Sequence, residues 1–132
     1  MFKKLALLFF IQFFVFNSSI SMEKETTFDK KLFDKAQSEG KIVVVSSWIK
    51  YCSSCASQMK VLNQAKNEGK LLDVNFQNIE YFSFDVTNKE IAELFNVKFQ
   101  TTLLIFKDNK EVYRSLGETT EDLIYQALKK TI

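Results

Sequence analysis

A short β-branched run, followed closely by both cysteines of this 132-residue chain, limits the folds that the sequence can adopt. Residues 42–45 read Ile-Val-Val-Val, polar on neither face, which is typical of a central strand buried on both sides. Cys52 and Cys55 come next, at the start of a helical pattern. One face of that helix is formed by residues that recur three or four apart, namely Cys55, Met59, Leu62 and Ala65. Gly69 is predicted to end the helix.

Similar patterns continue along the chain and predict the order α-β-α-β-α-β-β-α. The other strands are predicted at 80–86, 102–106 and 111–115, and the other helices near 28–36, after 87–90 and after 119–122. The strand–helix–strand portions predict parallel pairing, and a hairpin at Asp108-Asn109 adds an antiparallel edge. The fold class is therefore α/β, a three-layer sandwich whose mixed central sheet has helices on both faces.

The N-terminus has the pattern of an export signal. Lys3 and Lys4 precede an apolar run over residues 5–16, which is shorter than the roughly 20 residues that span a bilayer. Ser19 and Ser21 suit cleavage before Met22, so we predict a signal peptide over 1–21 and one domain over 22–132. The predicted location is the bacterial periplasm, and an uncleaved N-terminal anchor is the alternative.

Charge and composition exclude several classes of function. After removal of the predicted signal, acidic and basic residues balance, unlike the basic footprint of a nucleic-acid-binding protein. The chain has no histidine, which excludes Ser-His and Cys-His nucleophile pairs and imidazole metal sites. Export also implies an oxidising compartment, in which disulfides persist.

The two cysteines are open to four interpretations. A structural zinc site needs about four Cys or His ligands, and this chain offers two. A Cu(I) site on two thiolates lacks supporting histidines or a methionine cluster. A purely structural disulfide would close a very small loop and remove little chain entropy. The fourth interpretation, a redox dithiol, is favoured by the position of the pair between a buried strand and a helix.

The strand-to-helix placement gives the two sulfurs different roles. Cys52 lies in the first helical turn, where unpaired N–H groups and the helix dipole stabilise its thiolate, the attacking form. Cys55 lies one turn further on, within disulfide reach and on the buried face. Cys55 would therefore resolve a mixed disulfide formed on Cys52.

At this point the sequence resembles the thioredoxin superfamily over about residues 28–130. The segment 43–55 (VVVSSWIKYCSSC) looks like the family's strand, Trp-x-x-aromatic and CxxC, and 84–97, 102–108 and Leu116-Gly117 look like later family segments. The segment Asp85-Val86-Thr87 and its spacing from the cysteines look most like the corresponding part of the C-terminal periplasmic domain of the Dsb-type transmembrane thiol–disulfide interchange proteins.

The resemblance implies roles for five residues and also exposes departures. It makes Cys52 the nucleophile and Cys55 its disulfide partner, with Trp48, Tyr51 and Thr101 shaping the site and docking substrate. The family usually has a cis-proline where this chain has Thr101, and we predict a trans peptide there because non-proline cis bonds cost about 2.5–4 kcal/mol.

Two further departures concern polar residues near the cysteines. Thioredoxins proper carry a buried acid where this chain has Ser46, and a hydroxyl cannot act as the base for the resolving thiol. The residues between the cysteines are Ser53-Ser54 instead of Gly-Pro. Two roles are open to each hydroxyl, a hydrogen bond to a thiolate or capping of the helix, and we favour capping.

The function predicted from these observations is an exported thiol–disulfide oxidoreductase, with the reductase direction favoured. Its partners would be cysteine-containing proteins and a membrane-bound electron donor. We expect no organic cofactor, no metal, no nucleic-acid partner and a monomer. The alternatives are a non-catalytic thioredoxin-like binding module and a Cu(I) metallochaperone.

Overall fold

The computed structural model describes residues 25–132, without the side chain of Lys70. The predicted signal peptide and its cleavage site lie outside these residues. The predicted element order is confirmed, with additional short turns between the second helix and second strand. The elements are α1 (Lys30–Ser38), β1 (Ile42–Trp48), α2 (Ser53–Gln64), the π-helical turn η1 (Ala65–Gly69), α3 (Lys70–Leu72), the 3₁₀ turn η2 (Val74–Asn78), β2 (Ile79–Asp85), α4 (Lys89–Leu94), β3 (Thr102–Lys107), β4 (Lys110–Leu116) and α5 (Glu121–Thr131).

The four strands form one mixed sheet in the order β2-β1-β3-β4. The apolar run 42–45 is buried, with Val43, Val44 and Val45 each 0% exposed, as expected for a central strand. β1 pairs in parallel with β2 and antiparallel with β3, and β3 pairs antiparallel with β4. β1 therefore lies in the middle of the sheet and points its carboxyl end toward the cysteines.

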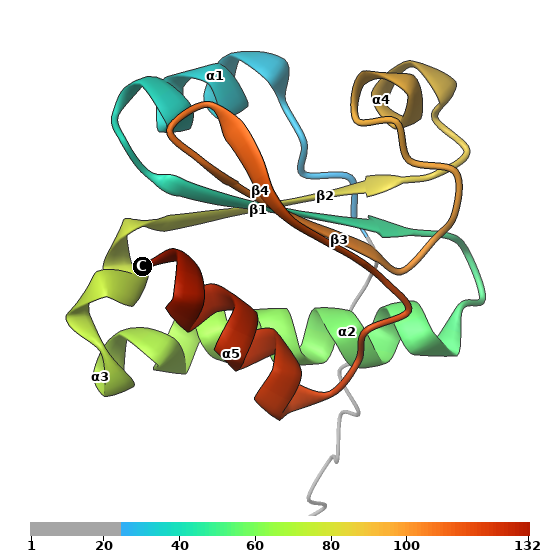
Figure 1. The fold of residues 1–132 in the computed structure, drawn as a ribbon. Coiled ribbons are helices and arrows are strands. Elements are labelled where there is room, and N and C mark those ends of the chain that lie inside the picture. The colour runs from blue at the N-terminus through green and yellow to red at the C-terminus, as the bar shows by residue number, and fades with distance from the viewer. Residues whose placement is uncertain (1–24) are drawn as a thin grey trace, which may run out of the picture.

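Helices cover both faces of the sheet and make a three-layer sandwich, as predicted. α1 and α4 lie on one face, and α2, α3 and α5 lie on the other (Figure 1). The α1/α4 side is rich in phenylalanine, including Phe33, Phe82 and Phe95. The α2/α5 side is mainly aliphatic, including Leu62, Leu103 and Ile124. Alternate residues of β1 point into the aromatic cluster on one face and the aliphatic cluster on the other. α2 therefore packs against the strand that precedes it.

The prediction that every strand–helix–strand portion pairs in parallel is wrong for β2–α4–β3. Ser46 pairs with Leu103 and Val43 with Phe106, so β3 starts at the end of the sheet where β1 finishes. A six-residue helix such as α4 is about 9 Å long, whereas a seven-residue strand such as β2 is about 23 Å long. α4 is too short to return the chain along the sheet, so β3 runs in the opposite direction.

The prediction that Gly69 ends the second helix is also wrong. The helical path continues through η1 into α3, and Gly69 keeps right-handed helical angles of φ −55° and ψ −37°. A Cβ at this position would overlap the ring of Phe76. Gly69 is therefore required by the close approach of Phe76 to the helix.

The predicted hairpin at Asp108-Asn109 is confirmed. Both residues have positive φ, 51° and 62°, in the tight turn between β3 and β4. Asp and Asn tolerate this left-handed conformation better than most residues, which favours the turn. Within residues 25–132, no helix is long and apolar enough to cross a membrane.

Candidate active site

The site lies where β1 leaves the sheet and α2 begins. Cys52 is the N-cap of α2, with extended backbone angles of φ −98° and ψ 111°. Its Sγ accepts a hydrogen bond from the backbone N–H of Cys55 at 3.1 Å. A sulfur at a helix N-cap replaces the usual oxygen acceptor, and it receives both an N–H group and the positive end of the helix dipole.

Cys52 and Cys55 are joined by a disulfide, with their Cα atoms 5.3 Å apart. The two residues differ in burial, because Cys55 is 0% exposed and Cys52 is partly exposed. One turn of helix separates them, so the buried face of α2 carries Cys55 while its N-terminus carries Cys52. A partner molecule can therefore reach Cys52, whereas Cys55 is covered by the protein.

Two aromatic residues precede the cysteines, as the sequence indicated. Tyr51 is 92% exposed and has a positive φ of 62°. The Lys50 ammonium lies 5.1 Å from the centre of the Tyr51 ring, within the range of a cation–π contact. Trp48 is partly buried at the carboxyl end of β1. The exposed Tyr51 ring is thus adjacent in sequence to the accessible sulfur.

Thr101 lies against the disulfide, although it is 46 residues beyond Cys55. The prediction of a trans peptide before Thr101 is confirmed, since the described residues contain no cis peptide. Thr101 instead has a φ of 60°, a conformation that is disfavoured for a β-branched residue. The absence of proline is therefore accommodated by a left-handed backbone at this position.

Two backbone hydrogen bonds and two buried side chains, those of Gln58 and Ser47, hold Thr101 in this conformation. Its N–H donates to Ser47 O at 2.8 Å, and its carbonyl accepts from Gly117 N at 2.9 Å. The same carbonyl accepts from Gln58 Nε2 at 3.3 Å, and Gln58 Nε2 also donates to Glu118 O at 2.8 Å. Thr102 N–H donates to Ser47 Oγ at 3.0 Å. These contacts on both sides of the peptide compensate for the unfavourable φ.

The Thr101 side chain reaches both sulfurs. Thr101 Oγ1 is 3.2 Å from Cys55 Sγ and 3.6 Å from Cys52 Sγ. It is also 3.0 Å from Ser54 Oγ, which lies 3.3 Å from Cys52 Sγ. Because disulfide sulfurs carry no hydrogen, any hydrogen bond to sulfur here is donated by a hydroxyl, and each hydroxyl donates to one neighbour at a time. The structure therefore brings together Cys52, Cys55 and Thr101, with Ser54 completing the group.

Sequence reasoning missed Gln58 and Ser47. Gln58 is 0% exposed and Ser47 is 1% exposed, and both hydrogen-bond the loop that carries Thr101. Gln58 occurs three residues after Cys55 on α2, so a polar residue on the inward face was a signal that it serves a buried hydrogen bond. Ser47 gives no comparable signal, because its partners lie more than 50 residues away.

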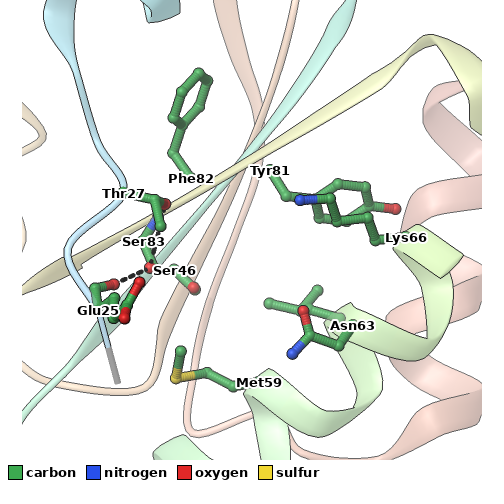
Figure 2. Close-up of a pocket in the computed structure, with 10 residues that line it drawn as sticks. Glu25, Thr27, Ser46, Met59, Asn63, Lys66, Tyr81, Phe82 and Ser83 are labelled. Carbon is green, nitrogen blue, oxygen red and sulfur yellow. Dashed lines mark hydrogen bonds between the residues drawn. The ribbon is translucent and has the colours of Figure 1, made fainter. Parts of the chain in front are cut away.

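Ser46, at the position of the acid in thioredoxins proper, is 3% exposed and lines a cavity of about 160 Å³. Ser46 and its strand neighbour Ser83 face Met59 and Asn63 of α2 across this cavity (Figure 2). Tyr81 also lines it, and burial raises the pKa of the Tyr81 phenol. The position that holds a buried acid in thioredoxins proper is therefore occupied in this protein by the hydroxyl of Ser46.

The described residues also bear on metal binding. Within residues 25–132, no three His, Cys, Asp or Glu side chains converge in a way that could hold a metal ion. The two cysteine sulfurs are bonded to each other. The geometry supplies redox chemistry at sulfur, in which the disulfide opens to two thiols and closes again.

Comparison with known proteins agrees with this geometry. The thioredoxin family model matches residues 19–130. A thioredoxin H-type of Fagopyrum esculentum is 27% identical over 95 residues, covering 71% of this chain and 76% of its own. A thioredoxin H-type of Oryza sativa subsp. indica is 27% identical over 105 residues, covering 79% of this chain and 80% of its own.

Among solved structures, the crystal structure of Trxlp from Edwardsiella tarda EIB202 has a TM-score of 0.69 and 24% identity. It covers 76% of this chain and 94% of its own, and it supports the fold alone. The family match extends over most of the chain and includes the joined cysteines. The chain belongs to the thioredoxin family, and it is a thiol–disulfide oxidoreductase.

Proposed function

We propose that this protein is an exported reductase of protein disulfides in which Cys52 attacks the substrate and Cys55 releases it. The observation that carries the proposal is the difference in burial between the two sulfurs. Cys52 is partly exposed at the N-terminus of α2, and Cys55 is 0% exposed behind it. In the reduced protein, the helix N-terminus and the Cys55 N–H favour the thiolate of Cys52.

The reaction balances in two exchange steps. The Cys52 thiolate attacks one sulfur of a substrate disulfide, which forms a mixed disulfide and releases the other substrate sulfur as a thiolate. The Cys55 sulfur then attacks Cys52 Sγ, the Cys55 proton is lost, and the second substrate thiol leaves. The substrate gains two electrons, and the protein finishes with the Cys52–Cys55 disulfide seen in the structure.

Substrate contact is proposed to depend mainly on the surface beside Cys52. Tyr51 presents a ring that is 92% exposed, and Trp48 lies partly buried nearby in sequence. The N–H and carbonyl of Thr101 are already bonded within the protein, so they are not free to pair with a substrate backbone. Thr101 therefore shapes the site and offers its hydroxyl, while Tyr51 supplies contact area.

The reducing direction and the compartment are further parts of the proposal. They are supported by the export pattern of residues 1–21 and by the resemblance to the Dsb-type interchange domain. An oxidising compartment would keep the cysteine pair as a disulfide, so a membrane-bound donor must supply electrons to it.

The activity is tested with insulin reduction and with trapping of the mixed disulfide. We expect the wild type to accelerate insulin reduction and Cys52→Ser to abolish that acceleration. Cys55→Ser should instead accumulate a covalent protein–substrate adduct, because Cys52 can attack but nothing resolves the product. The exposed variant Ser57→Ala on the same helix serves as the control. Equal adduct formation in both cysteine variants would contradict the assigned roles.

Export is tested separately by expressing the full chain in a bacterium with two membranes. The expected result is a soluble periplasmic protein whose intact mass corresponds to residues 22–132. A membrane-bound product that retains residues 1–21 would support the uncleaved anchor instead. A full-length product in the cytoplasmic fraction would contradict export.

A second candidate function, a binding module with an inert disulfide, is favoured by the hydroxyl at Ser46 and the unusual backbone of Thr101. It predicts stoichiometric binding of a partner protein that is unchanged in Cys52→Ser, with no insulin reduction. Stoichiometric Cu(I) binding by the reduced protein, with no disulfide exchange, would instead indicate a metallochaperone.

A further inference from the structure

The hydroxyls of Thr101 and Ser54 form a continuous chain between the two sulfurs. The successive distances are 3.2 Å from Cys55 Sγ to Thr101 Oγ1, 3.0 Å to Ser54 Oγ and 3.3 Å to Cys52 Sγ. A hydroxyl donates one hydrogen bond and accepts others, so each member can take a proton on one side and give one on the other. This is the arrangement that a proton relay requires.

The resolving step of disulfide exchange creates the need for such a relay. Cys55 must lose its proton to attack, yet its sulfur is 0% exposed. The side chain at the position of the family's acid is the Ser46 hydroxyl, which is a far weaker base than a carboxylate. Thr101 Oγ1 contacts Cys55 Sγ directly and is itself part of a residue that is only 2% exposed.

We propose that the Thr101 hydroxyl, assisted by Ser54, transfers the proton of Cys55 to the departing substrate sulfur during the resolving step. This inference rests on the proposed function and deepens it. In the mixed disulfide, the leaving sulfur is bonded to Cys52 Sγ, next to Ser54 Oγ. The Cys55 S–H donates its proton to Thr101 Oγ1, the Thr101 proton passes to Ser54 Oγ, and the Ser54 proton passes to the leaving sulfur.

The step balances without any additional reactant. The bond between Cys52 and the substrate sulfur breaks, and the Cys52–Cys55 bond forms. The proton lost by Cys55 is replaced on the substrate as a thiol hydrogen, and each hydroxyl ends with the one hydrogen that it had at the start. The proton therefore stays within the site, and no unpaired thiolate charge has to form on the buried Cys55 sulfur.

The backbone of Thr101 indicates why threonine serves in this role. Its positive φ and its bonds to Ser47 and Gly117 direct the side chain at the disulfide. Proline has no hydroxyl, and its ring holds φ near −65°, so it could provide neither the group nor this conformation. The Thr101 side chain thus replaces the family's proline and also supplies a proton-transfer group where the buried acid is missing.

The relay is tested by single-turnover kinetics of the reduced protein with two small disulfides. An aromatic disulfide releases a weakly basic thiolate that is stable without a proton, whereas glutathione disulfide releases a more basic thiolate that leaves more readily when it is protonated. The first phase of each reaction reports attack by Cys52, and the second reports resolution by Cys55. Thr101→Val keeps the shape and branching of the side chain and removes only the hydroxyl.

With glutathione disulfide, Thr101→Val is expected to slow the second phase about 100-fold, the typical contribution of a positioned proton-transfer group. The slowing should be less than about tenfold with the aromatic disulfide, because proton delivery to the leaving group is no longer needed. Thr101→Ser, which restores a hydroxyl, should recover most of the rate. Any change in the first phase should be the same for both disulfides, because the relay takes no part in the attack by Cys52.

Other outcomes overturn the proposal. Equal slowing with both disulfides, or no recovery in Thr101→Ser, would assign Thr101 a purely structural role. If Thr101→Val does not fold, Ser54→Ala is decisive, because Ser54 is exposed and its loss should slow the second phase more with glutathione disulfide than with the aromatic disulfide. Absence of the first phase in the wild type would instead contradict the proposed function and not the relay.

Discussion

Two regions of this molecule have the same unusual backbone but achieve it in different ways. In the β3–β4 turn, Asp108 and Asn109 have φ values of 51° and 62°. At the disulfide, Tyr51 and Thr101 have φ values of 62° and 60°. Asp and Asn accept this conformation at little cost, whereas an aromatic or β-branched residue does not.

The difference shows where the sequence agrees with the local backbone and where the rest of the protein imposes it. The turn needs only its own two residues, and its chemistry is readable from them. The site needs distant partners, namely Ser47, Gln58 and Gly117, to hold Thr101 in place. Strain kept by surrounding structure is typical of functional sites.

The strongest test of this comparison is Gln58→Met, which keeps the length of the side chain and removes both of its donors. We expect the free energy of unfolding to fall by about 2 kcal/mol, because the Thr101 and Glu118 carbonyls each lose the hydrogen bond from Gln58. Urea unfolding followed by Trp48 fluorescence measures the change. Ser57→Ala, one residue earlier and exposed, should stay within about 0.5 kcal/mol of wild type. Similar stability in both variants would show that Thr101 is not held by Gln58.

A smaller loss of stability is expected when a threonine, the residue type found at position 101, is placed in the β3–β4 turn. Asn109→Thr places a β-branched residue at a φ of 62° with no buried partners to compensate. The left-handed conformation should cost about 1–2 kcal/mol in unfolding free energy. Asn109→Gly is the matched control and should be neutral or slightly stabilising. Equal unfolding free energies for Asn109→Thr and Asn109→Gly would contradict the argument that the backbone of Thr101 is strained.

The smallest effect on stability is expected at Tyr81, where the protein affects the ionisation of the side chain and not the backbone conformation. Burial and then the charge of Tyr125 raise the pKa of the Tyr81 phenol. Because the folded-state pKa lies above the unfolded value of 10.0, the contribution to stability is complete below pH 10 and is lost as the pH rises further.

Tyr81→Phe should therefore flatten the alkaline loss of stability and leave the neutral range nearly unchanged. Urea unfolding at intervals between about pH 8 and about pH 11 measures this slope. An unchanged slope in the variant would mean that other groups cause the alkaline loss. Thr101→Val in the same series should keep the wild-type slope, since it removes no group that titrates in this range.

Much of the fold could be predicted from local patterns. The burial of residues 42–45, the hairpin at Asp108-Asn109 and the start of α2 at the cysteines all follow from periodicity and turn chemistry. Two predictions failed because they depended on distant packing. Gly69 is required by Phe76 instead of ending a helix, and β3 is antiparallel because α4 is too short to return the chain.

The α/β class, the cysteine pair and the different positions of Cys52 and Cys55 on the helix could all be predicted from local sequence patterns. These depend on residues close together in the chain, where spacing and helix geometry are sufficient. Three features of the site follow instead from the packing of distant segments: Thr101 reaches both sulfurs, Ser54 connects Thr101 to Cys52, and Gln58 binds the Thr101 carbonyl. Such contacts join segments more than 40 residues apart, and they form only when β1, α2 and β3 pack together.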